Sequence, residues 1–198
     1  MVELLRSAAR SASGRGAPDA AAAYLSRALD EPPDPGDKPG LLTELGLALA
    51  ADRHAAVPRI LPEAVELSGD PHERAERALL SARLLGLGAH FDIAAEICRD
   101  ALAERDSLDP TRIDELEAEL CINACLSPDT IAEALMLSDE HADDPAASSS
   151  WRIIAAFADT MRGRPAVDCL ARLGPLLAGE LSPAAPDSDF SSSRPTSM

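Results

Sequence analysis

The chain has 198 residues and a formal net charge of −16, with 34 acidic residues against 18 basic ones. This acidic excess argues against direct nucleic-acid binding and against docking on an anionic membrane, since both need clustered Lys and Arg. Ala and Leu supply 38 and 28 residues, whereas Val, Ile and Thr together supply 17, so the composition favours helices over strands. The length suits one domain or one short repeat array.

Proline residues recur where helices are expected to begin. Asp70-Pro71, Asp109-Pro110 and Ser127-Pro128 each place an N-cap residue before a Pro at the first helical position. Apolar residues at helical spacing follow them. The sequence therefore predicts helices over residues 2–13, 18–31, 39–52, 56–68, 71–87, 91–105, 110–125, 128–141, 150–162 and 165–179. Pro62 and Pro175 lie inside two of these helices and predict kinks.

Short turns alternate with longer polar loops, so the predicted helices pair into hairpins. The segments that close the first four hairpins begin at Tyr24, Ile60, Ile97 and Ala134, which are 36, 37 and 37 residues apart. This period lies just above the ~34 residues of a tetratricopeptide repeat. We therefore expect an all-α fold, a right-handed α-solenoid of about five tetratricopeptide-like hairpins over residues 1–180, with an unrelated helical bundle as the alternative. Residues 181–198 are rich in Ser, Pro and Asp and predict a disordered tail.

Four cysteines, Cys98, Cys121, Cys125 and Cys169, are scattered through apolar helical stretches. This spacing is not that of a small disulfide framework, so we expect reduced thiols and a cytoplasmic protein. Cys121 and Cys125 share a helix face and could begin a zinc site, but no further ligand lies nearby in sequence, and buried thiols are the better interpretation. Because the apolar runs are short, we expect neither a signal peptide at the start of this sequence nor a membrane-spanning stretch within it.

Motifs for nucleotide binding and catalysis are incomplete. The P-loop pattern is absent, and Gly86-Leu87-Gly88 is interpreted as a helix C-terminus. His72-Glu73 begins a metalloprotease pattern, but Glu76 replaces the second His, and a first helical turn with a Glu73–Arg77 pair fits better.

The other three histidines also have plain interpretations. His54 and His90 lie near turns inside hairpins, where we expect solvated side chains. His141 stands among acidic residues that could hold a cation weakly, although a solvated helix end is the simpler interpretation. We therefore expect no enzyme, no catalytic, cofactor-binding or metal-binding residues, and no cofactor in this chain.

The negative charge is concentrated in the middle of the chain. Residues 92–144 hold 16 acidic and three basic residues. Asp92, Glu96, Asp100 and Glu104 recur every four residues and predict one stripe on the sixth helix, while Asp114, Glu115, Glu117 and Glu119 crowd the seventh. This acidic face could dock a basic protein segment, or it could be a solvated face that keeps the protein soluble, and we favour the second interpretation.

Residues 15–29 (RGAPDAAAAYLSRAL), followed by Glu31-Pro32-Pro33, resemble the central helical-repeat region of large ATP-binding LuxR-type transcriptional regulators. Residues 41–46 (LLTELG), 71–75 (PHERA) and 93–97 (IAAEI) fit the same pattern, and the resemblance covers about residues 2–180. In that family an ATPase module precedes the repeats and a DNA-binding helix-turn-helix follows them.

The resemblance implies a non-catalytic protein-interaction or sensing segment that corresponds to a fragment lacking the ATPase and helix-turn-helix modules. ATP is then expected only in the missing ATPase module. The expected partners are a protein or peptide, or neighbouring domains of a larger regulator, and uncapped repeat ends would allow self-association. The alternative is a stand-alone tetratricopeptide-like adaptor with no link to transcription.

Overall fold

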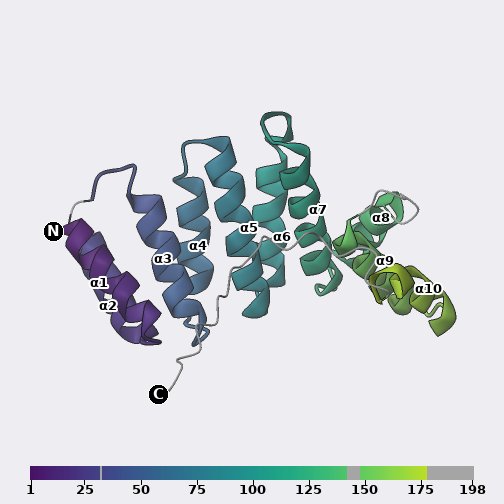
Figure 1. The fold of residues 1–198 in the computed structure, drawn as a ribbon. Helices are drawn as coiled ribbons and strands as arrows, with labels where there is room; N and C mark the ends of the chain where they lie inside the picture. The colour runs from purple at the N-terminus through teal and green to yellow at the C-terminus, as the bar shows by residue number, and fades with distance from the viewer. Residues whose placement is uncertain (32, 142–147, 178–198) are drawn as a thin grey trace, which may run out of the picture. The chain divides into compact units, whose positions relative to one another are not determined.

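A computed structural model describes residues 1–31, 33–141 and 148–177 of the chain (Figure 1). These residues form α-helices and a short 3₁₀ turn, and they contain no strand, which confirms the all-α prediction for this part of the chain. The helices are α1 (Val2–Gly14), α2 (Pro18–Asp30), α3 (Lys38–Ala50), α4 (Val57–Glu66), α5 (Pro71–Leu87), α6 (Phe91–Leu102), α7 (Pro110–Cys125), α8 (Ile131–His141), α9 (Ser149–Met161) and α10 (Ala166–Leu177). Crossing a bilayer would take a longer and more apolar helix than any of those described.

Most helix boundaries lie within a few residues of the predicted ones, because local signals place them. Asp70 and Asp109 cap α5 and α7, each accepting a hydrogen bond of 3.0 Å from the backbone N–H three residues later. Both α4 and α10 contain a Pro, at Pro62 and Pro175, and both continue past it.

Two of the predicted boundaries are wrong. The helix expected from Pro128 begins at Ile131, because a turn comes first, in which the Ser127 carbonyl accepts from the N–H groups of Thr130 and Ile131. The Thr130 hydroxyl donates to the Ala124 carbonyl and ties this turn to the end of α7. The helix expected to reach residue 105 ends at Leu102 and is followed by the 3₁₀ turn Arg105–Ser107.

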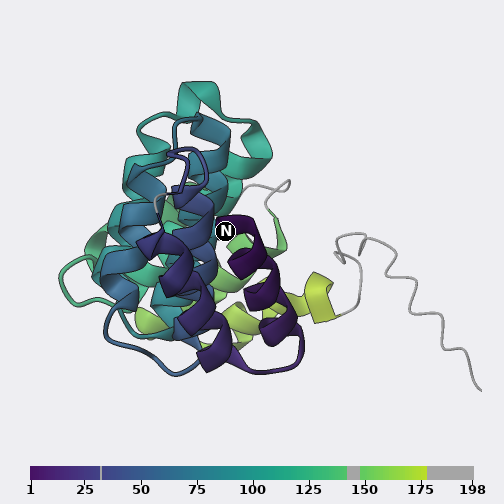
Figure 2. The same ribbon diagram turned by 90° about the vertical axis from the view of Figure 1, so that its left-hand side faces the viewer.

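The chain divides into two compact units, Met1–Leu137 and Ser138–Met198, and the division falls inside α8. In the first unit each helix from α1 to α7 packs on the next one in sequence. Contacts also join helices two apart, α3 with α5, α5 with α7 and α4 with α6. Figure 2, turned by 90° about the vertical axis, brings α1 and α2 towards the viewer, and these two helices pack on each other.

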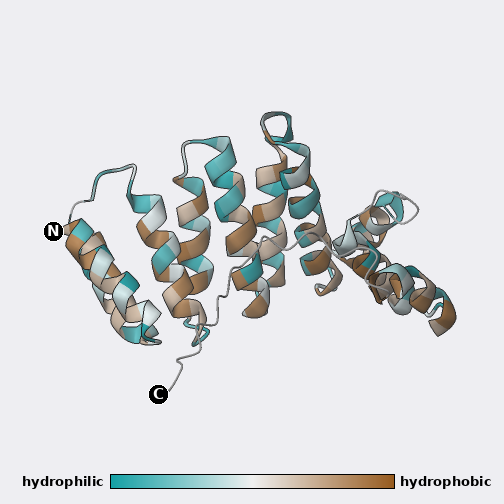
Figure 3. Cartoon of the chain, in the orientation of Figure 1, coloured by the Kyte–Doolittle hydropathy of each residue, from teal (hydrophilic) through white to brown (hydrophobic). Residues whose placement is uncertain are grey.

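Two clusters of buried residues hold this first unit together. One cluster gathers side chains from α1 to α4, including the fully buried Leu41, and the other gathers side chains from α4 to α7, including Leu85 and Leu116. Ala fills many of the buried positions, so the helices approach closely. Figure 3 shows hydrophobic segments along each of these helices.

Ion pairs connect helices two apart in the first unit. Arg6 on α1 pairs with Glu44 on α3, Arg83 on α5 with Glu119 on α7, and Arg99 on α6 with Glu133 on α8. The partners are 38, 36 and 34 residues apart in sequence. These separations lie close to the 36 to 37 residues at which the sequence pattern recurs.

In the second unit α9 packs against α10, and α9 carries a buried Trp151 and a buried Asp159. The Trp151 ring stacks on His141 with 3.8 Å between ring centroids. Asp159 pairs with Arg172 at 2.7 Å and with Arg164 at 3.2 Å, so its charge is compensated.

Candidate functional site

A groove of about 290 Å³ lies between α4, α6 and the beginning of α5, and we call it the α4–α6 groove. Its apolar lining comes from both helices, and its polar lining is almost entirely acidic. The lining residues are Pro62, Val65 and Glu66 of α4, Arg74 of α5, Ile93, Glu96, Ile97, Asp100 and Ala101 of α6, and Glu104 just after α6.

The groove accounts for part of the predicted acidic stripe. Glu96, Asp100 and Glu104 all line it, as expected for residues four apart on a helix. Asp92 does not, and lies beside the turn that precedes α8, with Ser127 and Pro128. Glu66 from α4 joins these three carboxylates, and no pattern along the sequence connects this residue with them.

Charges in the groove are unevenly compensated. Arg74 pairs with Glu104 and also donates to the Ser68 carbonyl, which holds this guanidinium in place. Within the described residues, no Lys or Arg pairs with Glu66, Glu96 or Asp100. Three carboxylates therefore lie beside apolar side chains without a cation to offset them.

Acidic residues on α7 have a different role. Glu119 pairs with Arg83 of α5, and Glu117 pairs with Arg105 of the 3₁₀ turn. Both carboxylates are largely buried, with side-chain exposures of 12% and 14%. Glu115 pairs with Arg112 within the first turns of α7. These acids stabilise contacts inside the fold and do not form a free docking face.

The cysteine side chains are thiols, and three of them, Cys98, Cys121 and Cys125, are buried, which confirms the interpretation of Cys121 and Cys125. Burial raises the pKa of the Cys98 thiol to about 12. A hydrogen bond with Cys125 and then burial raise the pKa of Cys121, whose thiol also donates to the Ala134 carbonyl at 3.3 Å. Among residues 1–31, 33–141 and 148–177, no group of three or more His, Cys, Asp or Glu is placed to hold a metal ion.

Two other motifs singled out in the sequence lie at the beginning and at the end of α5. His72 and Glu73 are exposed in the first turn of α5, and Glu73 pairs with Arg77 at 3.0 Å as predicted. Gly86 lies in the last turn of α5 and Gly88 caps its end, which confirms the interpretation of this segment as a helix C-terminus.

The remaining histidines differ in their surroundings. His54 is exposed in the turn before α4, where its Nδ1 accepts from the Ala56 N–H. His90 is half-buried and lies against Gly88. For His141 the predicted solvated helix end is wrong, because the imidazole ring stacks on the buried Trp151. Aromatic stacking between residues ten apart leaves no periodic signal in the sequence.

An exposed apolar stripe in the second unit is a second candidate site. Ile153, Phe157 and Met161 are four residues apart on α9, and all three are exposed. On α10 the exposed apolar residues are Val167, Leu170 and Leu177. The spacing of these residues was visible in the sequence, but which apolar face of each helix would be buried was not.

Comparison of the chain with protein-family models, with curated proteins and with solved structures finds no match.

Proposed function

We propose that this chain is a non-catalytic helical-repeat segment that binds other proteins, built as a right-handed α-solenoid of tetratricopeptide-like hairpins. The contacts between helices two apart support a stacked repeat, since each hairpin then covers its neighbour. The ion pairs between helices two apart, at sequence separations near the repeat period, support it as well.

The exposed apolar stripe on α9 and α10 is the main observation that supports the proposal of protein binding. Phe157 is 40% exposed and Leu170 is 58% exposed, although both belong to regular helices. No residue of α10 is buried. Exposed apolar side chains that gather on one helix face, as Ile153, Phe157 and Met161 do on α9, mark interaction sites in other proteins.

Another helical hairpin is the occupant that suits this stripe. In the first unit, helices also contact helices two further along, as α3 contacts α5, and Leu49 and Ala50 of α3 pack against the buried cluster that contains the α5 side chains. The apolar residues of the stripe on α9 are four residues apart, a spacing that buried apolar residues such as Ile60 and Ala64 of α4 also have. A second copy of this chain carries such a hairpin and is the partner with which we propose to test the surface.

Sedimentation equilibrium of the whole chain over a range of concentrations tests this proposal. We expect the mean mass to rise with concentration, because pairing of two stripes removes apolar surface from water. A variant with Phe157→Glu and Leu170→Glu should remain monomeric. Leu87→Glu, at a Leu that is 76% exposed at the end of α5, is the control and should associate like the unmodified chain.

A chain that stays monomeric at every concentration and unfolds cooperatively would contradict the stripe as a docking surface. That result would favour the stand-alone adaptor.

We further propose that the repeat acts within a LuxR-type ATP-binding regulator, coupling the sensing of a ligand or partner to transcription. The support is the resemblance of residues 15–29, 41–46, 71–75 and 93–97 to the repeat region of such regulators. Sequencing the DNA that flanks the gene tests this. ATPase-coding sequence upstream and helix-turn-helix sequence downstream would support the proposal, and their absence would leave the adaptor as the better account.

A further inference from the structure

The α4–α6 groove combines two features that suit one kind of side chain. Pro62 and Ile93 are half-buried and present aliphatic surface at the groove, with Ile97 buried beneath. Beside this surface lie Glu66, Glu96 and Asp100, which no cation among the described residues neutralises. An aliphatic stem that ends in a positive charge complements both features, which is the chemistry of Arg and Lys.

The size of the groove is sufficient for a single long side chain. Its volume of about 290 Å³ lies just below the ~300 to 1,000 Å³ that is usual for small-molecule pockets. An arginine suits the site better than a lysine, because its planar guanidinium meets two carboxylates at once and is more weakly hydrated.

We propose that the α4–α6 groove receives an arginine from a basic segment of a partner protein. The arginine stem lies along Pro62 and Ile93, and its guanidinium lies between Glu96 and Asp100 of α6 and Glu66 of α4. This inference rests on the proposed function, that the chain binds protein, and it assigns a partner chemistry to a surface separate from the α9–α10 stripe.

Several other acidic residues have a cationic partner, which these three carboxylates lack among the described residues. Glu104 is neutralised by Arg74, and Glu117 and Glu119 are neutralised by Arg105 and Arg83. Pro62 and Ile93 are only half-buried beside these charges, and a docked partner would cover the rest of their apolar surface.

Fluorescence anisotropy of a short fluorescein-labelled peptide, in which Arg alternates with Ser, measures this binding to the whole chain. We expect saturable binding that weakens as salt is added, and weaker binding of the same peptide with Lys in place of Arg. The double substitution Glu96→Gln with Asp100→Asn should weaken binding by roughly 2- to 30-fold, since each partly exposed ion pair contributes about 0.2 to 1 kcal/mol.

Asp92→Asn with Asp106→Asn is the matched control, because it removes the same charge from the same region outside the groove. This control should change the peptide affinity by less than the groove variant does. Equal weakening by both variants would overturn the proposal, since it would mean attraction by net charge alone. Equal affinity for the Arg and Lys peptides, or no peptide binding at all, would also overturn it.

The stripe variant, Phe157→Glu with Leu170→Glu, separates this inference from the proposed function. It should bind the Arg peptide like the unmodified chain. If the groove fails its test while self-association through the stripe persists, the groove assignment alone is wrong. Circular dichroism of each variant checks that the helices are retained.

Discussion

Gly46 lies where α3 packs on α4. A Cβ at this position would lie 2.2 Å from Leu61 Cδ2, and Leu61 is fully buried. Because Leu61 is enclosed by the core, it has little room to move away. The glycine therefore permits the approach of two helices that any larger residue would push apart.

We predict that Gly46→Ala lowers the free energy of unfolding by about 1–3 kcal/mol, the usual cost of overpacking a core. Equilibrium urea denaturation measures this change. Gly14→Ala is the control, because nothing lies within 4 Å of a Cβ there, and it should cause no loss. Unchanged stability of Gly46→Ala would show that α3 and α4 are further apart than described.

Side-chain caps distinguish helices that begin in otherwise similar ways. Helices α3, α5 and α7 each have a Pro in the first turn and an Asp at the N-cap. Only at α5 and α7 does the Asp side chain accept a backbone hydrogen bond. Asp37, before α3, has helical backbone angles and makes no such bond, because the carboxylate of an N-cap reaches the third N–H only from an extended backbone.

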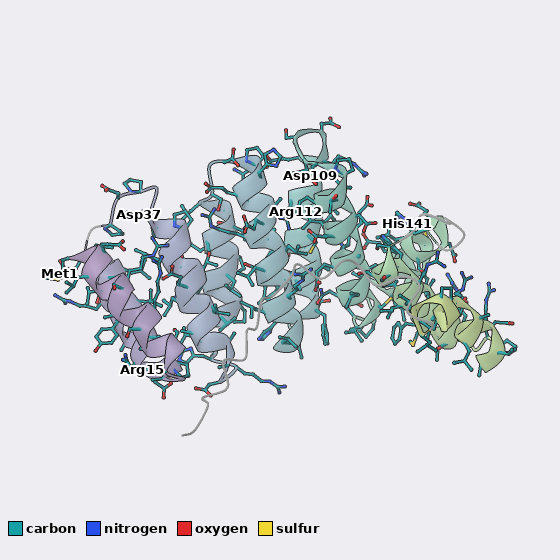
Figure 4. The ribbon with its side chains drawn as sticks, viewed as in Figure 1. Met1, Arg15, Asp37, Asp109, Arg112 and His141 are labelled. Carbon is teal, nitrogen blue, oxygen red and sulfur yellow. The ribbon has the colours of Figure 1, made fainter. Side chains whose placement is uncertain are left out.

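We predict that Asp109→Ala lowers the free energy of unfolding by about 0.5–2 kcal/mol, because the Arg112 N–H loses its acceptor. Figure 4 labels Asp109 and Arg112 at the beginning of α7, and also Asp37 before α3. Asp37→Ala should leave stability nearly unchanged. Thermal or urea unfolding of both variants provides the comparison, and equal losses would contradict the assignment of the caps.

Burial varies strongly among the helices of the whole molecule. Six residues of α5 are buried, including Leu79 and Leu85, whereas no residue of α10 is. Local opening is easiest where few apolar contacts must be broken. The molecule is therefore expected to open from α10 long before α5.

We predict that hydrogen exchange under native conditions is fastest in α10 and slowest in α5 and α6. Mass spectrometry of peptic fragments measures the protection of each helix, after correction for the intrinsic exchange rate of each sequence. Equal protection of α10 and α5 would contradict this expectation. Protection of α10 that appears only at high protein concentration would instead support pairing through the α9–α10 stripe.

Sequence patterns predicted the described helices and most of their boundaries, since caps, prolines and apolar spacing act over a few residues. They also predicted the buried thiols at Cys121 and Cys125 and the Glu73–Arg77 pair. The start of α8 was missed, because Ser127 and Pro128 form an N-cap signal that the turn held by Thr130 overrides. The arrangement of the hairpins as a solenoid and the link to a regulator stay predictions.

The sequence by itself determined that the chain is helical and that its negative charge gathers in residues 92–144, because composition and local spacing contain that information. Only the tertiary structure decided which acidic residues are neutralised. Glu119 meets Arg83 from 36 residues away, while Glu66 joins Glu96 and Asp100 from a different helix. Such contacts depend on how helices that are far apart in sequence pack together. A charge pattern along a single helix does not contain this information.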